Sequence, residues 1–269
     1  MSEILKERFV VFIDILGFGA MVRQAARDPD GDMANRLAAA LKVIEDLGQS
    51  RGDIVFPSKS NSDFHSHAFS DCIVMSVVPS AEVVAELFVV LAKLTLDLMK
   101  IGVWIRGGMS HGLISKTRTT PWGPAIVEAY EVESKLAINP RIAMGKSAVE
   151  FVNRAATGVQ KDDRLVRDDD GVWSLEPFVW VRSDAREKLP YLTKEKARRI
   201  KSELESAHEG VVDSPRIFSK IEWLRERWDS QLKPKDGVPI FDCRTELGIE
   251  QDSIEDWVTA FETAFKGED

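Results

Sequence analysis

Two aspartates stand out because each interrupts an apolar segment that should belong to a central β-sheet. Asp14 lies inside the β-branched and aromatic run from Phe9 to Leu16, and Asp71 lies between the apolar runs HSHAF and CIVMSVV. An unpaired carboxylate there is costly, so each needs a cation, a donor or a position at a strand end. Carboxylate oxygens suit Mg²⁺ and Mn²⁺, and two such ions about 3.5–4 Å apart can activate an attacking oxygen and neutralise a leaving group. Both aspartates are therefore candidate catalytic metal ligands; the alternative is that each caps a turn.

The sequence Gly17-Phe18-Gly19 follows the first of these segments directly. A glycine-rich turn between a strand and a helix presents backbone N–H groups to an anion, so these three residues are candidates for binding a phosphate group. The glycines could equally serve a tight turn through their dihedral freedom. The motif alone does not decide between the two interpretations.

The elements that must position these residues follow from hydrophobic periodicity and helix caps. After the first strand we expect two short helices, a hairpin turning at Ser70-Asp71, a long amphipathic helix capped by Ser80 and ended by Gly102, and a strand over 103–110. This order is β-α-α-β-β-α-β, and it predicts an α/β (α+β) fold with a central antiparallel sheet. Further predicted elements are a helix over 125–137, a small helix over 147–153, a hairpin at 168–171 and charged helices from 193 and 214 onward.

Composition excludes several classes of function. The net charge of −8 disfavours nucleic acid as a partner, because a protein binds phosphate backbones through a surface with many positive charges. The sequence holds no long apolar run and begins with charged residues rather than a signal peptide, so we expect a cytoplasmic protein that does not enter membranes. Cys72 and Cys243 lack CxxC spacing and are expected to be ordinary structural residues.

The segments FIDILGFGAMV, HAFSDCIVMSV, WIRGGMSHGLI and PWGPAIVEAYEVESKL follow one another along the chain. In this order and register the four segments resemble the catalytic domain of class III nucleotidyl cyclases. FIDILGFGAMV resembles the first metal-binding segment, HAFSDCIVMSV the hairpin of the second, and PWGPAIVEAYEVESKL a later helix. WIRGGMSHGLI resembles the strand that carries an Arg-x-Gly-x-x-x-Gly pattern, with Arg106, Gly108 and Gly112 in the matching positions. The match covers roughly residues 8–145, so we expect a catalytic core over 1–145 and a mixed α/β C-terminal elaboration of the same unit over 146–269.

The resemblance implies a ferredoxin-like core that cyclises a nucleoside triphosphate with two divalent cations, Mn²⁺ or Mg²⁺. Asp14, the carbonyl of Ile15 and Asp71 would be the metal ligands. Gly17, Phe18 and their turn would hold the triphosphate. Related domains act as head-to-tail dimers, so a homodimer with two sites is expected.

The chain departs from the family at several positions. The residues that would read adenine are replaced by His67 and Thr120, and the helix positions of a ribose-orienting asparagine and a charge-stabilising arginine hold Val127 and Glu131. Shifting the alignment by one residue offers Glu128 but no arginine. Arg106 is then the candidate for stabilising transition-state charge, or it is a strand arginine paired with a surface carboxylate.

With these departures the sequence resembles the pyrimidine cyclases of bacterial Pycsar antiphage defence. Their substrates carry a smaller base, which suits a site without the residues that select a purine. We expect UTP as substrate, with cyclic UMP read by a separate effector; CTP is the alternative, because His67 and Thr120 can each donate or accept. Other hypotheses are an inactive cyclase-like regulatory module, or a diguanylate cyclase or polymerase-like palm. The missing arginine and asparagine suggest the inactive module. The absence of a Gly-Gly-Asp/Glu-Glu-Phe motif disfavours a diguanylate cyclase, and the negative net charge disfavours a polymerase-like palm.

Two further clusters are expected to be structural. His65 and His67 alternate on one strand face, but without a third histidine or a nearby cysteine we interpret them as polar surface rather than a transition-metal site. Ile221, Leu224 and Trp228 have the spacing of a buried helix face, and the tryptophans are expected to make core or dimer contacts.

Overall fold

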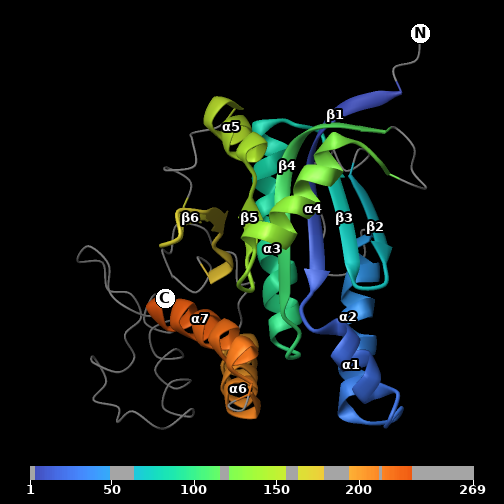
Figure 1. Cartoon of the computed structure of the whole chain (residues 1–269), viewed down its shortest axis with the longest axis vertical. Helices are drawn as coiled ribbons and strands as arrows, with labels where there is room; N and C mark the ends of the chain where they lie inside the picture. The colour runs from blue at the N-terminus through green and yellow to red at the C-terminus, as the bar shows by residue number, and fades with distance from the viewer. Residues whose placement is uncertain are drawn as a thin grey trace, which may run out of the picture. The chain divides into compact units, whose positions relative to one another are not determined.

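A seven-stranded sheet organises the first part of the chain (Figure 1). The computed structural model describes residues 4–48, 64–115, 121–155, 163–178, 194–211 and 214–231. The chain forms two compact units, Met1–Pro177 and Phe178–Asp269. The strands are β1 (Leu5–Ile15), β2 (His65–Phe69), β3 (Cys72–Val77), β4 (Ile105–Ser115), β5 (Ile142–Met144), β6 (Leu165–Arg167) and β7 (Trp173–Leu175), in the spatial order β2-β3-β1-β4-β5-β7-β6.

The first four strands have the connectivity that the sequence predicts. Helices α1 (Phe18–Ala25) and α2 (Asp32–Gly48) follow β1, and α3 (Ala81–Met99) joins β3 to β4. The strand order β2-β3-β1-β4 is antiparallel throughout, which is the ferredoxin-like arrangement. The predicted fold class, a mixed α/β protein with a central antiparallel sheet, is therefore confirmed.

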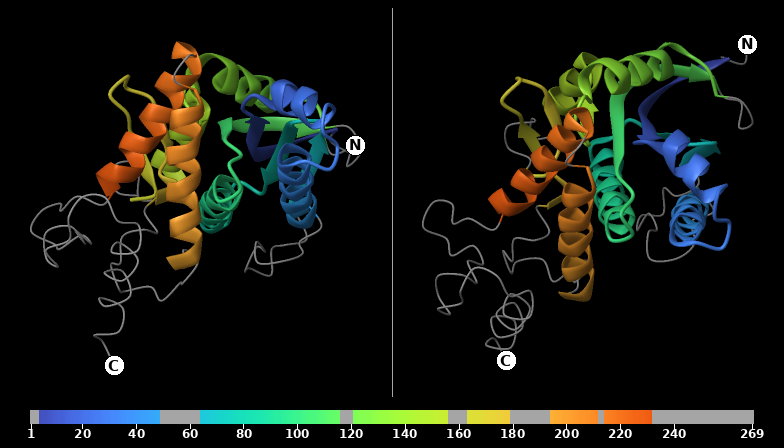
Figure 2. Two further views of the ribbon diagram at one scale, coloured as in Figure 1. Left: turned by 90° about the horizontal axis from the view of Figure 1, so that it is seen from below. Right: turned by 60° about the horizontal axis from the view of Figure 1, so that its bottom comes forward.

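The two faces of β1 differ in what covers them, because successive side chains of a strand point to opposite sides. Val10 belongs to a cluster with Ala125 and Ala129 of helix α4 (Pro124–Leu136), and Phe12 packs against this cluster. Phe9, on the opposite face, meets Phe88 of α3 edge-on at 6.1 Å between ring centroids. Figure 2 shows α4 on one side of the sheet and α2 and α3 on the other. Asp14 has the parity of Val10 and Phe12 and thus lies on the α4 face.

Glycines in β4 allow α4 to approach the sheet closely. A Cβ atom on Gly108 would lie 2.1 Å from the carbonyl oxygen of Ala129 and 2.6 Å from the backbone nitrogen of Glu133. Neither backbone atom can move without displacing the helix. The Arg-x-Gly spacing in this strand therefore serves helix packing, and it fixes the height at which α4 carries Glu133 above the sheet.

Helix α3 begins and ends where its cap residues predict. The backbone N–H of Val83 donates to the hydroxyl of Ser80 at 3.3 Å, which satisfies one of the unpaired donors of the first turn. Gly102 follows the last turn with a φ of 70°, a left-handed conformation that favours glycine. The length of α3 and the start of β4 are set by these two residues.

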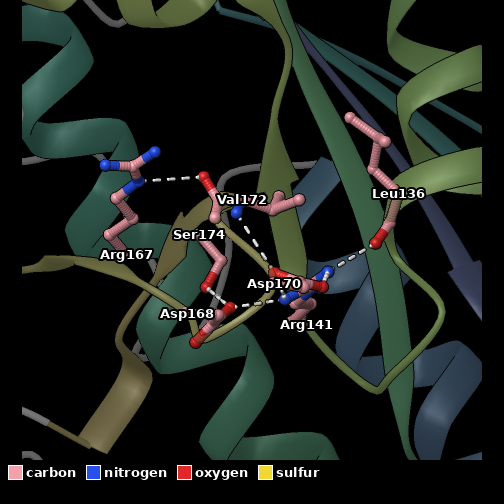
Figure 3. A network of polar contacts seen from close by, with 8 residues as sticks. Leu136, Arg141, Arg167, Asp168, Asp170, Val172 and Ser174 are labelled. Carbon is pink, nitrogen blue, oxygen red and sulfur yellow. Dashed lines mark hydrogen bonds and ion pairs between the residues drawn. The ribbon is translucent and has the colours of Figure 1, made fainter.

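Beyond α4 three short strands extend the sheet. A network of polar contacts around the buried Arg141 lies beside them (Figure 3). β5 runs parallel to β4, α5 (Lys146–Ala155) follows, and β6 and β7 form the hairpin predicted at 168–171. The guanidinium of Arg141 donates to Asp168 at 2.6 Å, to Asp170 at 3.1 Å and to the carbonyl of Leu136 at 2.7 Å. This network ties the hairpin to the end of α4.

The second unit contains helices α6 (Lys194–Gly210) and α7 (Pro215–Gln231). Ile221, Leu224 and Trp228 are buried, which confirms the predicted apolar face of α7, and the indole of Trp228 meets Phe178 edge-on at 5.3 Å. Among the described helices, none is long and apolar enough to cross a membrane. The boundary predicted at residue 145 stays a prediction.

Candidate metal centre

Asp14, Asp71 and Cys72 come together where β1 ends and the β2–β3 hairpin turns. Antiparallel pairing places Asp14 directly opposite Cys72, and the backbone N–H of Ile15 donates to the carbonyl of Asp71 at 3.2 Å. One ligand atom from each of the three side chains lies within 4.8 Å of the others. Ser70, in the turn, has a φ of 57°, which shapes the hairpin tip that carries Asp71. This group could hold a metal ion.

The donor set fits a hard divalent cation. Burial, followed by the charges of Asp71 and Asp14, raises the pKa of the Cys72 thiol to about 11. Sulfur is a soft ligand that suits Zn²⁺ or Cu⁺ rather than Mg²⁺, so the two carboxylates are the candidate donors for a hard cation. Carboxylate oxygens match the preference of Mg²⁺ and Mn²⁺. Burial also raises the pKa of Asp14 despite the opposing effect of Arg106, as expected for a carboxylate whose charge needs a nearby cation.

Arg106 supplies positive charge to this group from the neighbouring strand. Its Nε–H donates a hydrogen bond to Oδ2 of Asp14 at 3.0 Å. The same Nε lies 2.7 Å from Oε1 of Glu133, an ion pair without hydrogen-bond geometry, since this buried oxygen has no hydrogen-bond partner among the described residues. The side chain is 26% exposed. Within the described residues, its two terminal nitrogens have no hydrogen-bond partner. Arg106 is thus paired, but the side chains of its partners Asp14 and Glu133 are 17% and 3% exposed, so neither is the surface carboxylate that the alternative interpretation expected.

Glu133 is a buried carboxylate beside this group that the sequence did not single out. It is only 2% exposed, and its Oε2 accepts a hydrogen bond from the hydroxyl of Ser134 at 2.9 Å. The available signal was its spacing: Glu133 follows Ala125 and Ala129 at intervals of four residues, which places it on the buried face of α4. A carboxylate on such a face requires a cation, and Arg106 is that cation.

The turn after β1 is built as the glycine spacing suggests. Gly17 has a φ of 79° and caps α1, and its carbonyl accepts the N–H groups of Ala20 and Met21 at 2.9 and 3.1 Å. A Cβ atom there would meet nothing within 4 Å, so glycine is required by the backbone conformation rather than by space. Phe18 and Gly19 form the first residues of α1, next to the end of the strand that holds Asp14.

The predicted base-contacting residues are only partly described. His67 pairs with Val74 on β3, which in turn pairs with Phe12 on β1, so His67 shares the sheet face of Asp14. Burial lowers the pKa of His67, so its imidazole is neutral at pH 7. His65 lies two residues earlier on the same face and, like His67, is half-buried. Thr120 lies outside the described residues.

The exposed positions of α4 do not face the metal group. Val127 is 58% exposed, and the half-exposed side chain of Glu131 pairs with Lys135 at 3.1 Å. Glu128 accepts hydrogen bonds from the backbone N–H and hydroxyl of Ser147, at 3.3 and 2.8 Å, and so caps the start of α5. The helix positions that the resemblance assigns to an asparagine and an arginine, taken in either alignment, therefore bring no positive charge from α4 to the Asp14–Asp71 group.

Neither a protein-family model nor a curated protein sequence matches the chain. Solved structures similar to the chain include the monomeric guanylyl cyclase domain of the RhoGC fusion protein from the aquatic fungus Blastocladiella emersonii, at 14% identity and a TM-score of 0.41 over 64% of this chain and 98% of that one. A class III adenylyl cyclase-like ATP-binding protein from Pseudomonas aeruginosa is 14% identical, with a TM-score of 0.44 over 63% of this chain and 38% of that one. A bacterial light-regulated adenylyl cyclase is 12% identical, with a TM-score of 0.43 over 72% of this chain and 56% of that one. The chain thus spans less than two thirds of the length of the latter two.

Proposed function

We propose that this chain is a nucleotidyl cyclase that converts a pyrimidine nucleoside triphosphate, UTP in preference to CTP, into a 3′,5′-cyclic monophosphate and diphosphate. The observation that carries the proposal is the convergence of Asp14 and Asp71 at one end of two paired central strands, beside a glycine turn that starts a helix. Two acidic strand ends with hard oxygen donors are what two-metal phosphoryl chemistry requires. The four cyclase-like segments described above meet in this region.

In the proposed reaction the ribose 3′-oxygen attacks the α-phosphorus, the bond from that phosphorus to diphosphate breaks, and the 3′-hydroxyl proton leaves to solvent. Bound divalent cations would lower the pKa of the 3′-hydroxyl and neutralise the departing diphosphate. Asp14, Asp71 and the carbonyl of Ile15 would hold them. The N–H groups at the start of α1, in Phe18 and Gly19, would bind phosphate oxygens, because a helix N-terminus favours anions.

Arg106 would stabilise the negative charge that develops on the phosphoryl oxygens. Its Nε donates to Asp14 and forms an ion pair with Glu133, which leaves the two terminal nitrogens of the guanidinium to donate to an anion. Preorganised donors of this kind accelerate a reaction because they need no reorganisation as charge develops. Arg106 is therefore the proposed catalytic arginine of this chain.

The choice of base rests on His67 and Thr120, which replace the purine-reading residues of the family. A neutral imidazole can donate or accept a hydrogen bond, so His67 can meet either the 4-oxo or the 4-amino edge of a pyrimidine. UTP is the proposed substrate and CTP the alternative. A role in antiviral signalling, with a separate effector that binds the cyclic nucleotide, belongs to the same proposal and derives from the resemblance alone.

A homodimer is part of the proposal. Val127 and Tyr130, on the outer side of α4, are 58% and 53% exposed, and Trp122, just before the helix, is 52% exposed. We take these exposed large apolar side chains, on and just before one helix, as the association surface. A second copy of the chain would cover them, and it would bring to each site groups that its own α4 does not supply.

The test is to incubate the purified chain with ATP, GTP, CTP or UTP and Mn²⁺, and to resolve the products by mass spectrometry. Cyclic UMP as the main product supports the proposal, and cyclic CMP selects the alternative base. A chain that is folded and binds Mn²⁺ but cyclises none of the four would instead be the inactive nucleotide-binding module.

A further inference from the structure

Glu133 is a buried carboxylate for which the proposed reaction has no direct use. At 2% exposure it has lost its hydration, and a charge in that position is costly unless a cation compensates it. The compensating cation is Arg106, whose Nε is 2.7 Å from Oε1 of Glu133. Glycine at position 108 brings α4 close enough to the sheet for this contact.

The same Nε is also the partner of Asp14, at 3.0 Å. Arg106 thus lies between a carboxylate that belongs to the metal centre and one that does not. A divalent cation that binds Asp14 must compete with the guanidinium for the same oxygens, and it also adds positive charge beside it. The cost of cation binding therefore depends on whether Arg106 has another carboxylate to pair with.

We propose that Glu133 is a positioning residue that holds Arg106 as Asp14 binds a divalent cation, and that it thereby sets the cation affinity of the Asp14–Asp71 centre. The inference rests on the proposed function only in taking this centre as a cation site. With Glu133 present, the guanidinium keeps a charged partner while Asp14 turns its oxygens to the metal. Without that charge, Arg106 pairs with Asp14 alone and opposes the metal.

The substitution Glu133→Gln tests this idea, because it keeps the size of the side chain and a hydrogen-bond acceptor while removing the charge. Mn²⁺ binding is measured in the absence of nucleotide by electron paramagnetic resonance of the free ion. We expect the dissociation constant for Mn²⁺ to rise roughly three- to tenfold, which lies in the lower part of the coupling found between residues of one polar network. Glu131→Gln is the matched control: it removes the same charge from the exposed side of the same helix, and it should leave the dissociation constant unchanged.

A double-mutant cycle separates action through Arg106 from simple attraction between Glu133 and the metal. Arg106→Gln should tighten Mn²⁺ binding, because it removes the competing cation. In that background Glu133→Gln should have little further effect. If Glu133→Gln weakens binding equally with and without Arg106, the two residues act independently and the inference is overturned.

Other outcomes are equally decisive. Should Glu133→Gln not fold, as judged by its thermal unfolding curve, Arg106→Gln alone still discriminates: weaker or unchanged Mn²⁺ binding contradicts a competing guanidinium. If the wild-type chain binds no Mn²⁺ at all, the proposed metal centre fails together with the inference. If it binds Mn²⁺ and the cycle is additive, only the inference fails.

Discussion

Asp14 and Arg106 lie directly opposite each other on β1 and β4, with the Nε of Arg106 3.0 Å from Oδ2 of Asp14. This cross-strand pair joins the two central strands of the sheet at the point where the candidate metal centre forms. Glu133 lies above the pair on α4, so three charged groups from three elements meet on one face of the sheet.

Replacing Gly108 by alanine is expected to destabilise the chain and to disturb the centre. The added Cβ would lie 2.1 Å from the carbonyl oxygen of Ala129, so α4 must move outward and carry Glu133 away from Arg106. Overpacking against backbone costs about 1–3 kcal/mol in the free energy of unfolding, which urea denaturation measures. Gly210→Ala is the control, since its Cβ meets nothing within 4 Å and should be neutral or stabilising by about 0.5–1 kcal/mol. Equal stability of the two variants would contradict the close approach of α4.

The hairpin network of Arg141 predicts a specific dependence of stability on pH. The hydrogen bond from Arg141 lowers the pKa of Asp170 below its usual 3.8. A lowered pKa in the folded state contributes stability that is complete above the unfolded value and is lost as the pH falls through the folded one. Asp170→Asn should therefore cost at most about 1 kcal/mol at pH 7, because the 46% exposed carboxylate is partly screened by solvent, and less as the pH falls below 3.8.

Asp169→Asn is the matched control for this network, because Asp169 is the exposed neighbour in the same turn. Urea unfolding at pH 7 and at pH 3 compares the two variants with the wild type. A loss in Asp170→Asn that is as large at pH 3 as at pH 7 would show that the carboxylate charge is not what stabilises the hairpin.

Val127→Glu is expected to weaken self-association. The substitution places a charge in the exposed apolar patch of α4, and a charge at the centre of an interface is costly to desolvate. Sedimentation equilibrium should show a dimer dissociation constant at least roughly tenfold higher. Leu41→Glu, at an apolar side chain of α2 that is 42% exposed, should leave association unchanged. A wild-type chain that is monomeric at every concentration would overturn the proposed dimer.

Much of the fold could be predicted from the sequence because its signals are local. The apolar run around Asp14, the turn at Ser70-Asp71 and the cap at Ser80 each mark one element, and the element order then gives the ferredoxin-like core. The addition of β5, β6 and β7 to the same sheet could not be predicted. Each has three residues, too few for a periodicity to show which strand it joins.

The candidate site was predictable for the residues that break a pattern and not for those that depend on packing. Asp14 and Asp71 were found because each interrupts an apolar stretch, and Arg106 because of the glycine spacing after it. Glu133 was missed because it lies among other polar residues of α4, and only the approach of that helix over Gly108 buries it. The carboxylates that contact Arg106 are determined by the register of β1 against β4 and by the distance of α4 from the sheet. Local sequence encodes neither of these.

The central claim is that Asp14 and Asp71 together support metal-dependent cyclisation, and formation of cyclic UMP from UTP and Mn²⁺ tests it most directly. The wild type, Asp14→Asn and Asp71→Asn are compared by mass spectrometry after each has been shown to fold. The account predicts a cyclic product from the wild type and a loss of roughly a hundredfold or more in each variant, because a neutral amide cannot replace a carboxylate that binds the metal. Turnover in Asp71→Asn close to that of the wild type would contradict it.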